Sequence, residues 1–342
     1  MSIHILPANR PANRFYRGGS RIASFRAIPD DEQYVPEDWL ASVTTVFGDP
    51  SLGLTSLADG RTLRQAVADD PERWLGAAHV SAWGSDSKLL VKLLDAGQRL
   101  PVHAHPATAF AQEHLLRPHG KAEAWHILHG GEVHLGLRED VSMSELSDLV
   151  AHQRTGDLLD LLHTRTVEPG DTVFVPPGVL HAIGQDVFLA EVQEPEDLSI
   201  LLEWHGFAID GSRDGHLGLG FDAALTAVER ERMTEDRLGS LIARTPTLPA
   251  SADEYFRLSR RAYRPGDDLE PGFAVVIVLS GAAALTRGPL NVQVQAGNTL
   301  LLEYEGGPTA VDGEIEIIEF RPPLPAVRSL PSSTTEAART AH

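Results

Sequence analysis

The residue types best suited to chemistry stand at four positions: His103, His105, Glu123 and His181. His103 and His105 are separated by one residue, so on a β-strand both imidazoles would point to the same face. Three imidazole nitrogens and one carboxylate form a mixed nitrogen and oxygen shell for a divalent transition metal. Such a shell can leave coordination positions open for substrate or water, so the pattern predicts a metal centre capable of catalysis.

The alternative is an ordinary polar strand face, because the chain has 15 histidines. The surroundings of His181 favour metal binding, since a turn at Pro176-Pro177-Gly178 leads from the apolar strand 172–175 into this histidine. His126 lies an odd number of positions from Glu123 and is predicted to face away from the metal. Three histidines are predicted to be polar residues on a β surface: His126, His129 and His134.

Composition limits the function classes. A chain of 342 residues has room for two domains. Its net charge of −19 argues against a nucleic-acid partner, whose phosphates would be repelled. There is no cysteine, the N-terminus does not look like a signal peptide, and no apolar run is long enough to span a membrane. We therefore expect a cytoplasmic protein with a small-molecule partner.

Local patterns place these residues on elements. Thr62 and Gln65 form a capping-box pattern that opens a helix over 62–74, interrupted at Pro71. Strands are expected over 89–94 and 123–137, and again from 166 to 204. Leucines at helical spacing predict two helices within 143–163, and a further helix is predicted from 221 to about 243.

These elements suggest a division of the chain. Residues 1–137 and 166–210 are predicted to form an N-terminal metal-binding domain, with a helical region over 138–165 and 211–245. Short strands at regular spacing predict a second β domain over 250–322. No histidine follows the turn at Gly297-Asn298-Thr299, so this second unit should lack metal ligands. The tail, 323–342, is expected to be disordered.

Several motifs resemble those of type I mannose-6-phosphate isomerases. They are Glu37-Asp38-Trp39 with Ser42, residues 90–96, residues 102–106, residues 120–123, and residues 173–183. The resemblance implies a mainly β fold of two cupin jelly-roll barrels with a helical insertion, the second barrel lacking metal ligands. It also implies an aldose–ketose isomerase with zinc as cofactor, or else Mn²⁺, Co²⁺ or Fe²⁺.

The resemblance further implies roles for individual residues. By position, His103, His105, Glu123 and His181 would be the metal ligands. Lys92 and Lys121 would be catalytic or contact the substrate, and Glu191 would be the base that moves the proton. Three residues near the end of the last strand are expected to line the substrate site: Glu203, Trp204 and His205.

The chain departs from the family pattern at three places. His103 replaces a glutamine, Pro101 replaces a serine associated with phosphate, and Leu201 replaces a functional arginine. Leucine cannot replace the charged fork of arginine. The substrate is therefore expected to be a hexose whose C6 group is a phosphate, a free hydroxyl or another anion such as a sulfonate.

Two other functions are compatible with the sequence. A cupin oxygenase could use the same ligand set with iron or manganese. A non-catalytic sugar-binding protein could also retain the fold without the arginine. Oxygen uptake and proton exchange at C2 of a sugar would distinguish the three.

Overall fold

The computed structural model describes residues 3–29 and 33–325, and most of the expected tail lies outside them. The fold is mainly β, as predicted, and its three sheets have antiparallel pairings. None of the helices within these residues is both long and apolar enough to cross a membrane. The division into two jelly-roll barrels and the cytoplasmic location remain predictions.

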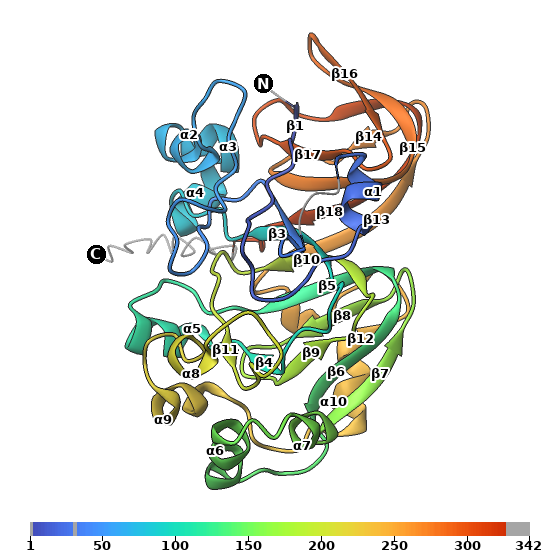
Figure 1. The fold of residues 1–342 in the computed structure, drawn as a ribbon. Coiled ribbons are helices and arrows are strands. Elements are labelled where there is room, and N and C mark those ends of the chain that lie inside the picture. The colour runs from blue at the N-terminus through green and yellow to red at the C-terminus, as the bar shows by residue number, and fades with distance from the viewer. Residues whose placement is uncertain (1–2, 30–32, 326–342) are drawn as a thin grey trace, which may run out of the picture.

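Two sheets carry the candidate site. The first, a six-stranded sheet, has the order β12 (Ile242–Ala243), β8 (Thr172–Val175), β5 (Glu123–His129), β10 (Phe188–Gln193), β3 (Leu90–Asp95) and β2 (Glu37–Leu40). The second, a five-stranded sheet, has the order β11 (Ile200–Leu201), β4 (His103–Ala104), β9 (His181–Ile183), β6 (Gly131–Leu137) and β7 (Leu162–Val167). In Figure 1 the five-stranded sheet, with β5 and β8, lies in the half of the molecule away from the N-terminus, and β3 and β10 lie near the middle.

A third sheet forms the other half. Its main path is β1 (Ile3–Ile5), β17 (Thr299–Leu302), β15 (Ala274–Arg287), β18 (Thr309–Arg321) and β13 (Arg257–Tyr263), with β14 (Asp268–Leu269) on β18 and β16 (Leu290–Gln295) on β15. Ile3 pairs with Leu302, so the first strand of the chain joins the C-terminal sheet. The division of the chain into domains remains a prediction.

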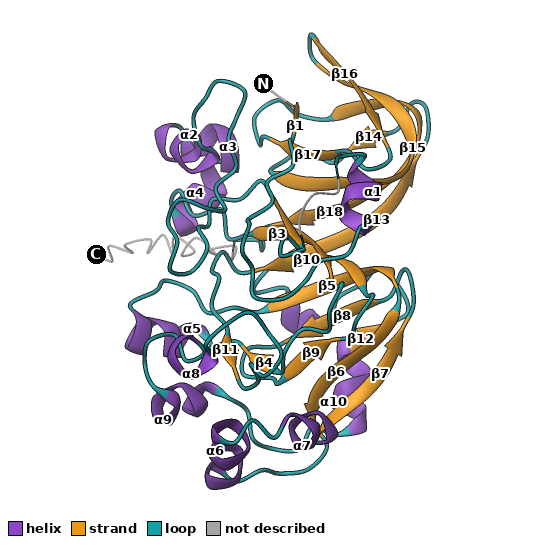
Figure 2. Cartoon of the chain, in the orientation of Figure 1, coloured by secondary structure: helices purple, strands orange, loops and turns teal. Residues whose placement is uncertain are grey.

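The helices are short and lie beside the sheets or at one end (Figure 2). They are α1 (Arg21–Arg26), α2 (Leu63–Asp69), α3 (Pro71–Leu75), α4 (Ala77–Trp83), α5 (Thr108–Phe110), η1 (Ala111–Leu115), α6 (Met143–Ala151), α7 (Thr155–Asp160), α8 (Gly211–Asp214), α9 (Phe221–Ala224), η2 (Leu225–Ala227), α10 (Glu235–Leu241) and η3 (Ala250–Ala252). The capping box of Thr62 and Gln65 is present, and Pro71 begins a new helix as expected.

The long helix expected from 221 to 243 is wrong. Its middle is irregular because neighbouring segments take its backbone hydrogen bonds: the amide of Glu229 donates to Gly178 O and that of Met233 to Leu137 O. A new helix, α10, then starts at Thr234, whose side chain caps it.

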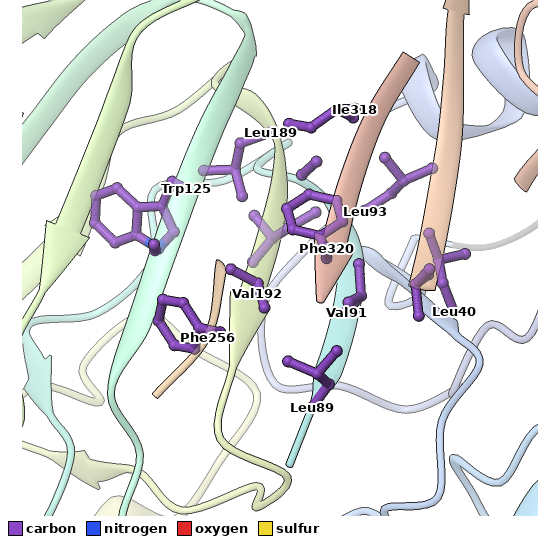
Figure 3. Close-up of a cluster of buried hydrophobic side chains, with 14 of the residues drawn as sticks. Leu40, Leu89, Val91, Leu93, Trp125, Leu189, Val192, Phe256, Ile318 and Phe320 are labelled. Carbon is purple, nitrogen blue, oxygen red and sulfur yellow. The ribbon is translucent and has the colours of Figure 1, made fainter. Parts of the chain in front are cut away.

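A shared apolar cluster joins the six-stranded sheet to the C-terminal sheet (Figure 3). Val91 and Leu93 of β3 lie in it with Ile318 and Phe320 of β18, and all four are at most 1% exposed. Each such side chain contributes about 1.5–3 kcal/mol by leaving water. Alternation along β3 then turns Lys92 to the opposite face of the sheet, toward the candidate site.

His126 was expected on a polar surface, and this is wrong. The ring is 0% exposed, and neither ring nitrogen has a hydrogen-bond partner among residues 3–29 and 33–325. The C-terminal sheet covers it, with Arg260 and Glu316 near by, and burial with the charge of Arg260 lowers the pKa of His126 to about 4. Sequence alternation gave the correct face of β5, but it could not reveal that a second sheet packs there.

Candidate functional site

Three histidines converge between the two sheets. His103 on β4 is the register partner of His181 on β9, and His105 follows β4 directly. One ring nitrogen from each of the three lies within 4.8 Å of the others. All three rings are buried, with exposed fractions of 6% or less. The structure therefore brings together three of the four residues predicted to hold a metal.

Each ring is oriented by a backbone carbonyl. The Nδ1 atoms of His103, His105 and His181 lie 2.8, 2.7 and 2.9 Å from the oxygens of Pro101, Leu198 and Val179. A carbonyl can only accept a hydrogen bond, so each Nδ1 carries the proton and each Nε2 presents a lone pair. Orientation of metal-binding imidazoles by a hydrogen bond at the other nitrogen is typical of metal sites.

Glu123 completes the donor set from the other sheet. Its Oε2 lies 3.0 Å from Nε2 of His105, and its Oε1 lies 3.2 Å from Nε2 of His181. The Nε2 of His181 is buried and has no hydrogen-bond partner in the described part of the chain. Burial also lowers the pKa of His103, and that of His105 to about 3, which keeps both rings neutral. These donors fit a divalent transition metal.

The predicted catalytic residues lie beside this group. In register across the six-stranded sheet, Trp39 pairs with Lys92, Lys92 with Glu191, and Glu191 with Trp125. Lys92 Nζ lies 3.8 Å from Glu191 Oε1, and Lys121 Nζ lies 4.0 Å from the same oxygen. Lys121 also lies 3.0 Å from Glu123 Oε2. One cavity thus brings together the expected base and both expected lysines.

Glu191 has the properties of a poised base. It is 3% exposed, and its Oε1 accepts no hydrogen bond from the described residues. Burial, followed by the charge of Glu123, raises the pKa of Glu191 to about 7, although Lys92 and Lys121 oppose the shift. A carboxylate with this pKa can take up and return a proton near neutral pH.

Four further residues border the site: Arg14, Tyr16, Glu37 and Asp197. Glu37 accepts hydrogen bonds from Tyr16 and from Trp39, and it lies 3.6 Å from Lys92. Burial alone would raise the pKa of Glu37, but the charges of Arg14 and Lys92 lower it to about 2. Arg14 in turn donates to both oxygens of Asp197, at 3.1 and 3.3 Å.

The sequence reasoning missed three of these four. Glu37 belonged to an early motif, whereas Arg14, Tyr16 and Asp197 carried no assigned role. Arg14 and Asp197 are 183 positions apart, and no local pattern links them. The nearest signal was the acidic segment 194–197, which directly follows the strand bearing Glu191.

Two neighbouring cavities, called here the inner and the outer chamber, lie at the site. The inner chamber, about 30 Å³, is bordered by His103, Glu123, Glu191 and both lysines. The outer chamber is much larger, about 600 Å³. The two share four lining residues: Arg14, Phe15, Asp197 and Ser199. His103 and Pro101 line the inner chamber and Leu201 the outer one, so all three departures from the family motifs border these chambers.

The residues expected to line the substrate site near the end of the last strand are not brought there. β11 ends at Leu201, so side-chain alternation does not continue beyond it. Glu203 instead binds Arg99, at 2.6 and 2.8 Å, and the amide of Val102. Trp204 stacks on Phe221, and His205 is exposed. None of the three borders either chamber.

The chain is similar to several known proteins. No family model matches the chain. Mannose-6-phosphate isomerase ManA of Bacillus subtilis is 28% identical over 244 residues, covering 69% of this chain and 75% of the relative. Mannose-6-phosphate isomerase of Streptococcus mutans is 27% identical over 253 residues, covering 71% and 78%. The solved structure of mannose 6-phosphate isomerase from Bacillus subtilis superposes with a TM-score of 0.73 at 21% identity, covering 94% of this chain and all of that one.

Proposed function

We infer that this chain, which belongs to the type I mannose-6-phosphate isomerase family, is a sugar isomerase that interconverts an aldose and its ketose. One observation carries the chemical part of the proposal. A buried carboxylate with a pKa of about 7, Glu191, lines the same small cavity as Glu123 and His103, and His103 is one of the three clustered imidazoles. This combination suits the transfer of a proton between two adjacent carbons of a hexose.

We propose that His103, His105, Glu123 and His181 hold a divalent metal, and we favour zinc because three imidazoles and a carboxylate suit it. The same donors would also accept Mn²⁺, Co²⁺ or Fe²⁺. When bound, the ion would act as a Lewis acid toward the oxygens of the open-chain sugar. Glu123 belongs to one sheet and the histidines to the other side of the cavity, so both sheets must be in place to form the site.

Glu191 is the proposed base. Its carboxylate removes the proton from C2 of the aldose, and the electron pair of that C–H bond forms the C1=C2 double bond of a cis-enediol. The π electron pair of the C1=O bond moves to O1, which takes up the proton that O2 releases, and Glu191 returns its proton to C1 to give the ketose. Lys121 and Lys92, both within 4.0 Å of Glu191 Oε1, stabilise its carboxylate form and can donate to sugar hydroxyls.

Isotope transfer tests this function. The zinc-loaded protein is incubated with open-chain-competent hexoses deuterated at C2, and the products are followed by NMR. We expect a ketose that carries part of the deuterium at C1 or has exchanged it with water. Treatment with a chelator should abolish turnover, and adding the metal back should restore it. Oxygen uptake without isomerisation by the iron-loaded protein would favour an oxygenase instead.

A further inference from the structure

We propose that the sugar turned over by this isomerase has an uncharged C6 end, and that the outer chamber selects against C6 phosphate and C6 sulfonate. The proposal rests on the isomerase function inferred above. It concerns which hexose the site accepts, not which reaction occurs.

The sizes of the chambers place the far end of the sugar. The inner chamber of about 30 Å³ has room for two or three water-sized groups. It can hold the reacting C1 and C2 oxygens beside Glu191, but not a whole hexose. The rest of the molecule must extend past the shared residues Arg14, Phe15, Asp197 and Ser199 into the outer chamber.

The charges lining the outer chamber are unfavourable for an anion. Three lining side chains are carboxylates: Asp49, Asp197 and Asp214. The lining contains two cationic side chains, Arg14 and Arg213, and each is engaged by one of these carboxylates. Among the described residues that line this chamber, no cation is left over to neutralise a phosphate.

Arg14 is fixed in its pair. Its side chain is 10% exposed, and its two terminal nitrogens bind the two oxygens of Asp197. Asp197 also accepts a hydrogen bond from the backbone amide of Phe47, a residue that lines the outer chamber. Breaking this pair would leave a buried aspartate uncompensated, which costs several kcal/mol and is far more than a surface contact returns.

Arg213 is the more exposed of the two cations. Its Nε and Nη2 donate to Asp214 at 2.9 and 2.6 Å, but its side chain is 74% exposed. Such an exposed pair is worth about 0–1 kcal/mol, so Arg213 could leave it. A phosphate would then gain one arginine while facing Asp214 and Asp49 directly.

The remaining wall suits an uncharged group. Five aliphatic side chains line the outer chamber: Val46, Leu52, Leu201, Ile209 and Leu217. Leu201 and Leu217 are buried, with exposed fractions of 3% and 6%. Transfer of an anion toward such a wall costs free energy that only charged or multiple polar partners would offset. A hydroxymethyl or methyl group at C6 meets no such penalty.

The first test compares substrates with the zinc-loaded, full-length protein. The kcat/KM values are measured for D-mannose, 6-deoxymannose and mannose 6-phosphate. We expect the two uncharged sugars to exceed the phosphorylated one by about tenfold or more, equivalent to ~1.4 kcal/mol. A higher kcat/KM for mannose 6-phosphate would overturn the proposal while leaving the isomerase function intact.

Binding measurements distinguish the proposed preference for an uncharged C6 group from the proposed isomerase function. Calorimetric titration with mannitol and mannitol phosphate measures the preference of the chamber without any turnover. If no sugar is isomerised, the proposed function fails, and the order of the two affinities still decides the present inference. Tighter binding of the uncharged polyol supports it, and tighter binding of the phosphate refutes it.

A second test changes the charge balance. Asp214→Asn removes one carboxylate and frees Arg213, so the ratio of kcat/KM for mannose 6-phosphate to that for mannose should rise by about threefold to tenfold. Asp312→Asn removes an exposed carboxylate from the C-terminal sheet and serves as the matched control. An unchanged ratio in Asp214→Asn would overturn the role given to the Asp214–Arg213 pair.

Leu201→Arg adds a cation to the outer chamber without freeing one. The ratio of kcat/KM for mannose 6-phosphate to that for mannose should rise in this variant, provided that its melting temperature shows it to be folded. Leu324→Arg, at a 68% exposed position, is the control for the added charge. A folded Leu201→Arg protein with a lower ratio than the parent would contradict the proposal.

Discussion

At the scale of single residues, the burial of Glu191 gives its carboxylate the properties of a base. The carboxylate is buried, its Oε1 accepts no hydrogen bond from the part of the chain that the structure describes, and it is held between two lysines rather than paired with one of them. A purely structural glutamate in a buried ion pair would be expected to have a lowered pKa, as Glu37 has. Burial and the charge of Glu123 instead raise the pKa of Glu191.

Replacing Glu191 by glutamine should lower kcat by about 10²–10⁴-fold, the usual contribution of a positioned acid–base group. The amide keeps the shape but cannot take up a proton. Sugar affinity, measured by calorimetry, should change far less than kcat, and deuterium exchange at C2 should disappear. Glu132→Gln, at an exposed position on β6, is the control. A variant that loses binding and turnover in equal measure would point to a structural role.

The same pKa predicts the acidic limb of the pH profile. Only the carboxylate form is a base, so kcat/KM should fall about tenfold per pH unit below the pKa of Glu191 and level off above it. Burial raises that pKa to about 7, and a bound divalent cation would lower it, so the limb should lie at or below pH 7. An acidic limb that persists unchanged in the residual activity of Glu191→Gln would assign it to another group.

At the scale of elements, Glu303 connects three segments of the chain. It follows β17 and accepts hydrogen bonds from Arg73 of α3, both at 3.0 Å, and it lies 2.8 Å from His4 Nε2 of β1. Burial would raise the pKa of Glu303, but hydrogen bonds and charges from His4 and Arg73 lower it to about 2. Because its folded-state pKa lies below the usual value of 4.5, the carboxylate stabilises the fold above pH 4.5.

Glu303→Gln should therefore lower the free energy of unfolding by about 1–3 kcal/mol at pH 7. The difference from the parent protein should shrink as the pH falls from about 4.5 toward 2, where the parent also loses this charge. Denaturant unfolding at several pH values measures this difference in the free energy of unfolding. Glu305→Gln is the matched control, since Glu305 is 59% exposed and lies 4.0 Å from the same arginine. Equal effects of the two substitutions would contradict this assignment.

Elements also explain which parts of the site could be predicted from the sequence. His103 and His105 lie on one short segment, and a proline–glycine turn precedes His181, so local spacing was informative. Glu203, Trp204 and His205 were placed in the site from the resemblance and an expected strand that continues to 204, but β11 stops at Leu201. The Arg14–Asp197 pair and the burial of His126 depend on contacts between distant segments, which no local period encodes.

At the scale of the whole molecule, the proposed metal would tie the two site-bearing sheets together. His103 and His181 come from the five-stranded sheet, and Glu123 comes from the six-stranded one. A ligand that binds only the folded state stabilises it by about 4 kcal/mol when present at 1,000 times its dissociation constant. Chelation should therefore lower the melting temperature, and zinc should restore it.

His181→Ala separates this effect from general stability. The variant removes one of the three converging imidazoles, so it should bind less than stoichiometric zinc by elemental analysis and lose turnover. Its melting temperature should then be the same with and without a chelator, whereas that of the parent protein should differ. His152→Ala, at an exposed position at the end of α6, should retain both the metal and the chelator-dependent shift. A chelator-dependent shift that survives in His181→Ala would place the stabilising metal elsewhere in the molecule.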